Sequence, residues 1–213
     1  MTTPNTPRRR GRPPKLTREA VLAAALEVLD ESGHGGLSMR AVADRLGVGK
    51  MSLYHHVADK AQMERLVIER LMAELPVPDA ELPWRERVSA LARSVRSLVI
   101  RRPNATPLVA LREYSDPASL RLPEALMRAL HDAGLRGTAL VGASRLVFSY
   151  AIGYAQIDLV APGEATSPMA SLPEADFPHI VAGARATRGL SFDDQFELGL
   201  QPLLAGLAAM AAG

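Results

Sequence analysis

The chain has 213 residues, of which 47% are hydrophobic and only 4% aromatic, and its formal net charge at pH 7 is +2. It contains no cysteine, which excludes disulfides, thiolate metal sites and a cysteine nucleophile. No apolar run has the length of a signal peptide or a membrane span, so we expect a soluble protein of the cytoplasm with no membrane partner.

Positive charge is concentrated near the N-terminus. Residues 1–60 hold ten Lys and Arg against six Asp and Glu, whereas residues 61–213 hold fifteen against seventeen. A basic segment joined to a near-neutral remainder favours a polyanionic partner, and nucleic acid is the first candidate.

Residues 1–16 are rich in Thr, Pro, Gly and Arg, a composition that predicts a disordered basic arm. Within it, Arg10-Gly11-Arg12-Pro13 resembles the core of an AT-hook, an extended unit that fits a narrow A·T-rich minor groove. The alternative is a nonspecific polybasic arm that only neutralises phosphates. In either case we expect Arg10 and Arg12 to contact DNA.

Three short helices are predicted after the arm. Thr17 is a good N-cap, and apolar residues at helical spacing follow it over residues 18–32. A second helix runs from its cap at Ser38 to Gly47, which breaks it, and a third covers residues 49–56.

The remainder also has a helical period and contains no convincing strand. Asp59 and Gln62 have capping-box spacing and open a longer helix that Pro76 ends. Further helices are predicted over residues 84–102, 107–114, 123–133, 137–160, 177–185 and 192–210. The fold class is therefore all-α. The expected parts are the arm over 1–16, an N-terminal three-helix helix-turn-helix domain over 17–60, a connecting helix over 61–76, and a C-terminal helical bundle over 77–213.

Residues 38–57 have the pattern of a helix-turn-helix. Ala43 is small where two helices would cross, Gly47 suits a tight turn, and Val42, Leu46, Val48 and Leu53 supply apolar contacts between them. A plain helical hairpin fits the same spacing, so the pattern alone leaves both interpretations open.

The stretch LSMRAVADRLGVGKMSLYHHVADK closely resembles the DNA-binding domain of the tetracycline-repressor (TetR) family. The preceding TREAVLAAALEVLDESGHGGLSMR is similar to that family's first helix and loop. LPWRERVSALARSVRSLVIRRP and FDDQFELGLQPLLAGL resemble the first and last C-terminal helices of the branch named after the tetracycline repressor. The resemblance implies a ligand-responsive transcriptional regulator, in the first instance a repressor, that binds a palindromic DNA operator as a homodimer.

The resemblance also implies roles for single residues on the DNA side. The third helix would lie in the major groove, with Lys50, Met51 and Ser52 facing base edges. The remaining contacts would be to phosphates for Tyr54 and Lys60, to a base or a phosphate for Arg40, and near the DNA backbone for His56. A metal site at His55 and His56 is disfavoured, because adjacent helical residues point about 100° apart. We therefore expect neither a metal nor a cofactor.

The C-terminal bundle would combine dimerisation with effector binding. The apolar stripe expected at the dimer interface consists of Phe192, Phe196, Leu200, Leu203, Leu204 and Leu207. The residues expected to line the effector pocket are Leu91, Val95, Tyr114, Met127, His131, Phe148 and Tyr154. The polar and aromatic anchors used for tetracycline in the namesake branch are replaced here by Leu75-Pro76, Leu91 and Val95, so we expect a largely apolar effector.

Three alternatives to this interpretation remain. An enzyme is disfavoured, because the cluster of Glu113, Asp116, His131 and Asp132 lies on ordinary helical patterns without a phosphate loop, a serine elbow or metal-ligand spacing. An architectural or ligand-independent DNA-binding protein would use the basic arm and sense nothing. A third alternative keeps the same fold but acts as an activator, or as a repressor without a ligand.

Overall fold

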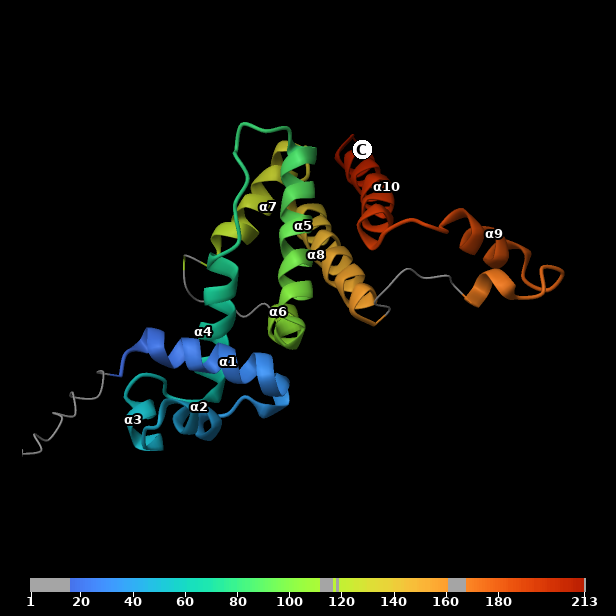
Figure 1. The fold of residues 1–213 in the computed structure, drawn as a ribbon. Coiled ribbons are helices and arrows are strands. Elements are labelled where there is room, and N and C mark those ends of the chain that lie inside the picture. The colour runs from blue at the N-terminus through green and yellow to red at the C-terminus, as the bar shows by residue number, and fades with distance from the viewer. Residues whose placement is uncertain (1–15, 112–116, 118, 161–167, 213) are drawn as a thin grey trace, which may run out of the picture.

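The computed structural model describes residues 16–111, 117, 119–160 and 168–212, and in this part of the chain it contains helices and no strand. The predicted all-α class is therefore confirmed. A small head at the bottom of Figure 1 consists of α1 (Arg18–Gly36), α2 (Met39–Leu46) and α3 (Lys50–Tyr54), and α4 (Lys60–Ala73) rises from it. Arg10 and Arg12 lie outside the described residues.

The body above the head is arranged around α5 (Trp84–Arg101), which packs mainly against α8 (Gly137–Val160) and α7 (Arg121–Asp132). Two short elements, η1 (Pro103–Ala105) and α6 (Thr106–Leu111), return the chain from the foot of α5 to the head. The last elements are η2 (Pro168–Ser171), α9 (Pro178–Ala186) and α10 (Phe192–Ala212). No helix among the described residues has both the length and the apolar character needed to cross a lipid bilayer.

The predicted helix caps are present. The backbone amides of Ala20 and Ala41 donate to the hydroxyls of Thr17 and Ser38, each over 3.1 Å. The amide of Gln62 donates to Asp59 over 2.7 Å, and the Gln62 side chain accepts from the amide of Ala58 over 2.6 Å. These bonds satisfy N–H groups that have no partner within the first helical turn. Local sequence chemistry therefore sets where three of the helices begin.

Several helix boundaries differ from the prediction by one or two residues, and the end of α1 differs by four. α3 ends at Tyr54 rather than at residue 56, α7 begins at Arg121 rather than at residue 123, and α1 continues to Gly36. Within α1, Gly33 has φ +69° and ψ 178°, so regular helix ends close to the predicted position and a short turn follows. A residue with a Cβ would be strained at this positive φ.

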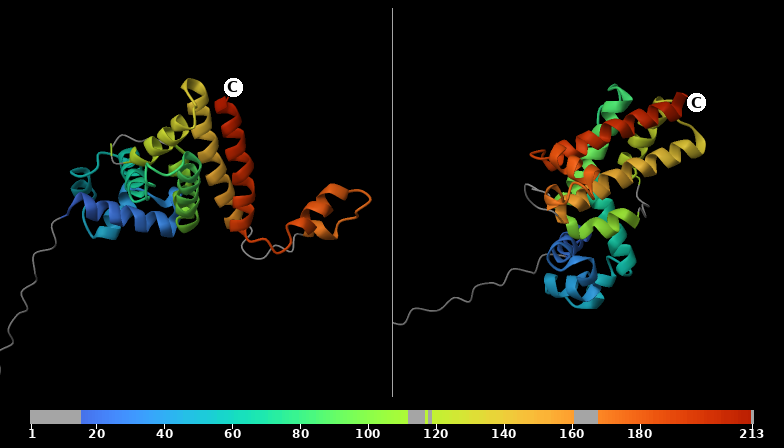
Figure 2. Two further views of the ribbon diagram at one scale, coloured as in Figure 1. Left: turned by 90° about the horizontal axis from the view of Figure 1, so that it is seen from above. Right: turned by 90° about the vertical axis from the view of Figure 1, so that its right-hand side faces the viewer.

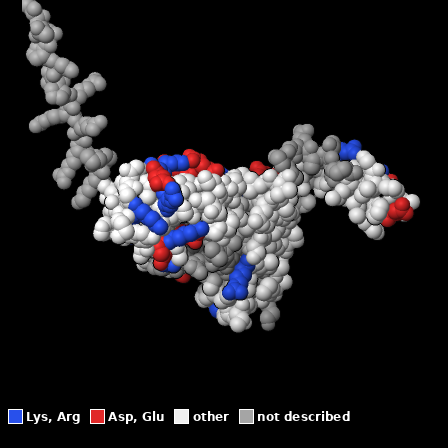
Figure 3. All heavy atoms as spheres, turned by 90° about the horizontal axis from the view of Figure 1, so that it is seen from below, with Lys and Arg blue, Asp and Glu red and all other residues white. Residues whose placement is uncertain are grey.

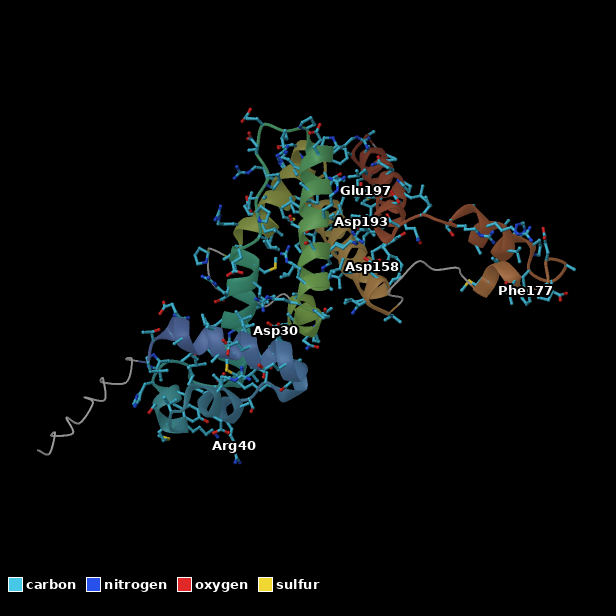
Figure 4. All side chains as sticks on the ribbon, viewed as in Figure 1. Asp30, Arg40, Asp158, Phe177, Asp193 and Glu197 are labelled. Atoms are coloured by element: carbon cyan, nitrogen blue, oxygen red, sulfur yellow. The ribbon has the colours of Figure 1, made fainter. Side chains whose placement is uncertain are left out.

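A buried arginine connects the last helix to the body. Arg96 of α5 forms ion pairs with Asp158 of α8 over 2.8 Å and with Asp193 of α10 over 2.6 Å, and its guanidinium lies 4.8 Å from the ring centre of Phe196. Burial by itself would lower the pKa of Arg96, but the hydrogen bonds that its guanidinium donates to Asp193 and Asp158 raise it above its ordinary value. The side-chain hydroxyl of Tyr150 also donates to the carbonyl of Phe196 over 2.5 Å. Figure 4 shows Asp158 and Asp193 close together along this seam.

The two carboxylates that pair with Arg96 allow a test of how burial changes the contribution of an ion pair to stability. The side chain of Asp158 is 7% exposed and that of Asp193 is 83% exposed. Asp158→Asn should lower the free energy of unfolding by about 3 kcal/mol, because it leaves a buried cation short of a partner. Asp193→Asn should lower it by less than about 1 kcal/mol. Urea unfolding at one fixed protein concentration measures both, and equal losses would contradict the assignment of the buried pair.

Candidate nucleic-acid interface and effector cavity

The α2–α3 turn has the backbone that the sequence predicts. Gly47 caps α2 in the left-handed conformation, with φ +64° and ψ 30°, and its amide donates to the carbonyls of Ala43 and Asp44. Leu53 and Val57, 0% and 1% exposed, anchor α3 and the turn after it in the core of the head. α3 is therefore a short helix with its inner side fixed and its outer side free.

The outer side of α3 carries the residues expected to face DNA. Lys50 and Ser52 are exposed, Met51 is 73% exposed and Tyr54 is 39% exposed. The Lys50 ammonium lies 5.7 Å from the centre of the Tyr54 ring, within the range of a cation–π contact. The structure therefore brings these four side chains together on one surface of the head.

Arg40, His56 and Lys60 flank this surface and are held more loosely than core groups. Arg40, labelled at the lower edge of the head in Figure 4, pairs with Asp44 over 3.7 Å, and both side chains are highly exposed. Lys60 pairs with Glu64 over 3.4 Å, and His56 is half-buried. Because exposed ion pairs contribute about 0–1 kcal/mol, Arg40 can exchange its carboxylate for a phosphate at little cost. Glu64 is mostly buried and also contacts His34 over 2.9 Å, so it keeps a partner if Lys60 turns to a phosphate.

Figure 3 views the molecule from below, where Lys and Arg gather on the head among a few carboxylates while the central surface is neutral. Part of the acid on the head is already engaged. Arg45 of α2 holds Glu27 over 3.0 Å and also pairs with Glu31, both on α1. Its hydrogen bond lowers the pKa of Glu31 below the ordinary value. These pairs fix α2 against α1 and neutralise carboxylates that would otherwise repel a phosphate backbone.

The head is attached to the body at the C-terminal end of α1. Asp30 forms an ion pair with Arg102 at the foot of α5, and the side-chain amide of Asn104 donates to the carbonyl of Asp30 over 2.8 Å. Asp30 lies at this junction between head and body in Figure 4. A Cβ built on Gly33 would lie 3.7 Å from the Asn104 side chain, so η1 sits close against the end of α1. The foot of α5 is thus in direct contact with the head.

A wholly apolar cavity lies in the body between α5, α7 and α8. Three i,i+4 pairs of aliphatic positions converge on it, together with Ala92 and Phe148, and the arrangement leaves no room for a water molecule. The lining residues are Leu91, Ala92, Val95, Leu122, Leu126, Val147, Phe148 and Ala151. An apolar compound that enters here must displace at least one of the three helices.

The residues expected around the effector do not all meet at this cavity. Leu91, Val95 and Phe148 line it, whereas His131 is an exposed residue at the end of α7. Tyr154 packs against Phe196 of α10, with ring centres 5.6 Å apart. Met127 is half-buried on α7 outside the lining set, and Tyr114 lies outside the described residues. The prediction favoured aromatic and polar residues, while the structure assembles the cavity mainly from aliphatic ones at i,i+4 spacing.

The apolar stripe predicted for the dimer interface is mostly internal. Phe196, Leu200, Leu204 and Leu207 are at most 3% exposed within a single subunit, and Phe192 and Leu203 are half-buried. Phe196 packs on Tyr150 and Arg96 of the same chain. The stripe therefore packs α10 against the body of its own subunit, and a partner subunit would contact a different face of the helix.

That other face is apolar and open. α8 and α10 lie side by side on one flank of the body in both views of Figure 2. Space is open at Gly142, Gly153 and Gly206, where an added Cβ would meet no atom within 4 Å. The large exposed apolar side chains of these two helices are Val141, Leu146, Ile157 and Val160 of α8 and Leu198 and Met210 of α10.

Comparison with known protein families covers nearly the whole described chain. Residues 21–65 match the model of bacterial regulatory proteins of the tetR family, and residues 77–211 match the tetracyclin repressor-like C-terminal domain. The first range spans the helices of the head, and the second spans the body, the cavity and the α8–α10 flank.

Individual relatives agree with these family matches. An HTH-type transcriptional regulator of Saccharopolyspora erythraea is 32% identical over 206 residues, covering 93% of this chain and 87% of the relative. The HTH-type transcriptional repressor DrrR1 of Streptomyces coeruleorubidus is 31% identical over 220 residues, covering 95% and 81%. The crystal structure of ActR of Streptomyces coelicolor in complex with actinorhodin superposes with a TM-score of 0.80 at 29% identity and covers 93% of this chain and 98% of ActR. The chain thus belongs to the tetR family of bacterial regulatory proteins and is a helix-turn-helix transcriptional regulator.

Proposed function

We propose that this protein represses transcription by binding a palindromic operator as a homodimer and that a largely apolar small molecule releases it. The observation that carries the proposal is the exposed cationic surface of α3, held by the anchors Leu53 and Val57, on a head that contacts the foot of a cavity-lining helix. DrrR1 is a repressor by name, and ActR has been crystallised with a small molecule. Operator binding places the protein in the bacterial cytoplasm, where the chromosome lies.

Regulation fits the chain better than catalysis. Within the cluster weighed as an active site, Nδ1 of His131 is 3.9 Å from Asp132, too long for a hydrogen bond. Asp132 is instead held by Arg87 over 2.7 Å, which lowers the pKa of its carboxyl and keeps it ionised. Glu113 and Asp116 lie outside the described residues. A general base needs a carboxylate or imidazole oriented toward a substrate pocket. Asp132 is engaged by Arg87, and His131 lies exposed at the end of α7, outside the lining of either cavity.

The dimer would form through the open flank of α8 and α10. Two heads must sit about one DNA turn apart to read a palindrome, so a rigid connection between subunits is required. Packing this flank against its copy would make a four-helix arrangement and bury the six exposed apolar side chains. η2 and α9 stand away from the body in Figure 1, and Phe177 and Ile180 in this region are also exposed.

Release of the operator follows from the path between cavity and head. Leu91 and Val95 line the cavity, and Arg102 lies about two turns further along the same chain, where it grips Asp30 of α1. An effector that binds the opened cavity shifts the population toward a body in which α5 has moved. The displaced foot of α5 carries α1 with it, which changes the separation of the two recognition helices.

The basic test locates the operator and the effector together. The protein should protect a two-fold symmetric site in DNA flanking its own coding region in a footprinting assay. Compounds screened on that complex should include apolar molecules that remove the protection. Binding to all duplexes alike, with the same salt dependence, would instead identify an architectural protein.

The roles on α3 separate by substitution. Tyr54→Ala should weaken binding to every sequence, because it removes a backbone contact. Lys50→Ala should relax base preference at one position and cost about 1–3 kcal/mol on the best site. Fluorescence anisotropy on operator variants measures both effects, with Arg188→Ala, on an exposed position outside the head, as the control. If neither Tyr54→Ala nor Lys50→Ala changes DNA affinity, α3 is not the recognition helix.

The dimer flank is tested with a charge. Ile157 is 57% exposed and Leu198 is 62% exposed in the isolated subunit. Ile157→Glu or Leu198→Glu should shift the protein to monomers in sedimentation experiments, because an unpaired carboxylate would be buried at the interface at a cost of several kcal/mol. Leu120→Glu, at an exposed position outside α8 and α10, should leave the dimer intact. A dimer that survives both flank substitutions must use another surface.

The coupling is tested at two adjacent arginines. Arg102→Ala removes the ion pair with Asp30, whereas Arg101→Ala removes only a hydrogen bond to Ser97 within α5. With a releasing compound from the screen, Arg102→Ala should raise the concentration needed for release by at least about fivefold, which corresponds to roughly 1 kcal/mol of coupling. Arg101→Ala should respond like the wild type. An equal response of both variants would show that the signal bypasses this junction.

A further inference from the structure

A second cavity, separate from the apolar one, lies beside the chain segment that joins α4 to α5. It is open in this conformation and has a volume of about 240 Å³. Its walls come from that segment, from the start of α5 and from the first half of α7. The lining residues are Val77, Pro78, Ala80, Arg87, Arg121, Glu124, Ala125 and Arg128. We call it the arginine groove.

Arg87 is a fixed positive charge in the wall of the arginine groove. Its side chain is 8% exposed, and one guanidinium nitrogen donates to Asp132 over 2.7 Å. The buried Nε has no hydrogen-bond partner within the described part of the chain. Because one of its N–H groups has no acceptor among the described residues, the positive charge of Arg87 is incompletely compensated, which favours an anion nearby.

The α7 wall adds further positive charge. Arg121, Glu124 and Arg128 are spaced i, i+3 and i+7, so they share one face of the helix. Glu124 lies 3.9 Å from Arg128, at the outer limit of an ion pair, and among the described residues Arg121 has no ion-pair partner. Three guanidiniums thus face a groove that contains one carboxylate of its own, with Asp132 behind Arg87.

The other walls are apolar. Val77, Pro78, Ala80 and Ala125 offer hydrocarbon surface next to the arginines. A cavity of this size is slightly below the range of about 300–1,000 Å³ that holds drug-sized ligands, so the occupant is small. Hydrocarbon on one side and excess positive charge on the other match an amphipathic anion.

We propose that the arginine groove binds a small organic monoanion, a carboxylate with a short apolar body. The carboxylate lies against Arg121 and Arg128, next to the fixed charge of Arg87, and the body packs on Val77 and Ala125. This site differs from the apolar cavity in being open and charged. The two share α5 and α7, because Arg87 is one turn from Leu91 and Ala125 is next to Leu126. An anion in the groove therefore acts on the same helices as an apolar effector.

Octanoate and its neutral counterpart octanamide test this with the full-length protein. They have the same apolar body and differ in charge. Trp84 is the single tryptophan of the chain and lies at the start of α5, three residues before Arg87, so its fluorescence reports on the groove. Octanoate should change the Trp84 emission saturably, octanamide should bind at least about tenfold more weakly, and added salt should weaken octanoate only.

Three variants are expected to differ from one another in their affinity for octanoate. The double variant Arg121→Ala with Arg128→Ala should bind octanoate at least about fivefold more weakly, because two groove cations are lost. Glu124→Gln should bind it more tightly, because the groove's own carboxylate is removed. The control, Arg185→Ala with Arg188→Ala, removes the same charge from α9 and the turn after it, and should bind octanoate like the wild type.

Each alternative result overturns the proposal. Equal affinity for octanoate and octanamide would mean that the ligand enters an uncharged site such as the apolar cavity. Unchanged octanoate binding in the Arg121 and Arg128 double variant would place the anion elsewhere. No saturable binding at millimolar octanoate would mean that the groove takes no such anion. None of these results bears on operator binding, which is measured separately by the affinity for DNA.

Discussion

Arginines along α5 and directly after it form ion pairs that fix the positions of the neighbouring helices relative to α5. Each pairs with one or two carboxylates of neighbouring helices, and the directional bonds of a guanidinium fix how the paired helices are turned relative to one another. Apolar packing around the same helix is stronger in total but has no direction. Carboxylates of this set are labelled along the body and at the head junction in Figure 4. The pairs are Arg87–Asp132 on α7, Arg93–Glu197 on α10, Arg96–Asp158 on α8 and Arg102–Asp30 on α1.

This arrangement explains how a regulator without large moving parts can respond to a small molecule. The cavity residues of α5, from Leu91 to Val95, lie between Arg87 and Arg96. Because the closed cavity has no room for even a water molecule, entry of a ligand requires a helix to move. In the proposed mechanism, the ion pairs of Arg93 and Arg96 would transmit that movement to α10, on the proposed dimer flank, and the pair of Arg102 would transmit it to α1 in the head.

The proposed recognition surface can exchange its partners. Lys50 is exposed, and Arg40 pairs with an exposed Asp44 over 3.7 Å. Arg87 and Arg96 of the body are buried and are paired at closer range, over 2.6 to 2.8 Å. Arginine thus has two roles in this protein. Exposed arginines remain available for phosphates, and buried ones stay with their carboxylates because separation would leave a desolvated charge.

The sequence by itself determined the all-α fold, the helix starts and the helix-turn-helix, because these depend on neighbours within a few residues. Thr17, Ser38, Asp59 and Gly47 act through bonds to their own turns, and the period of apolar residues shows which side of each helix is buried. The resemblance of residues 37–60 to a known DNA-binding domain followed from the same local pattern. Only the tertiary structure decided whether an apolar stripe packs in the subunit's own core or is left exposed for a partner. Phe196 and Leu200 form a stripe that suits a partner subunit as well as the chain's own core, and the fold buries them within the subunit. The cavity, the arginine groove and the Asp30–Arg102 junction also depended on the fold, because each joins residues far apart in the chain, and no local spacing specifies such a contact.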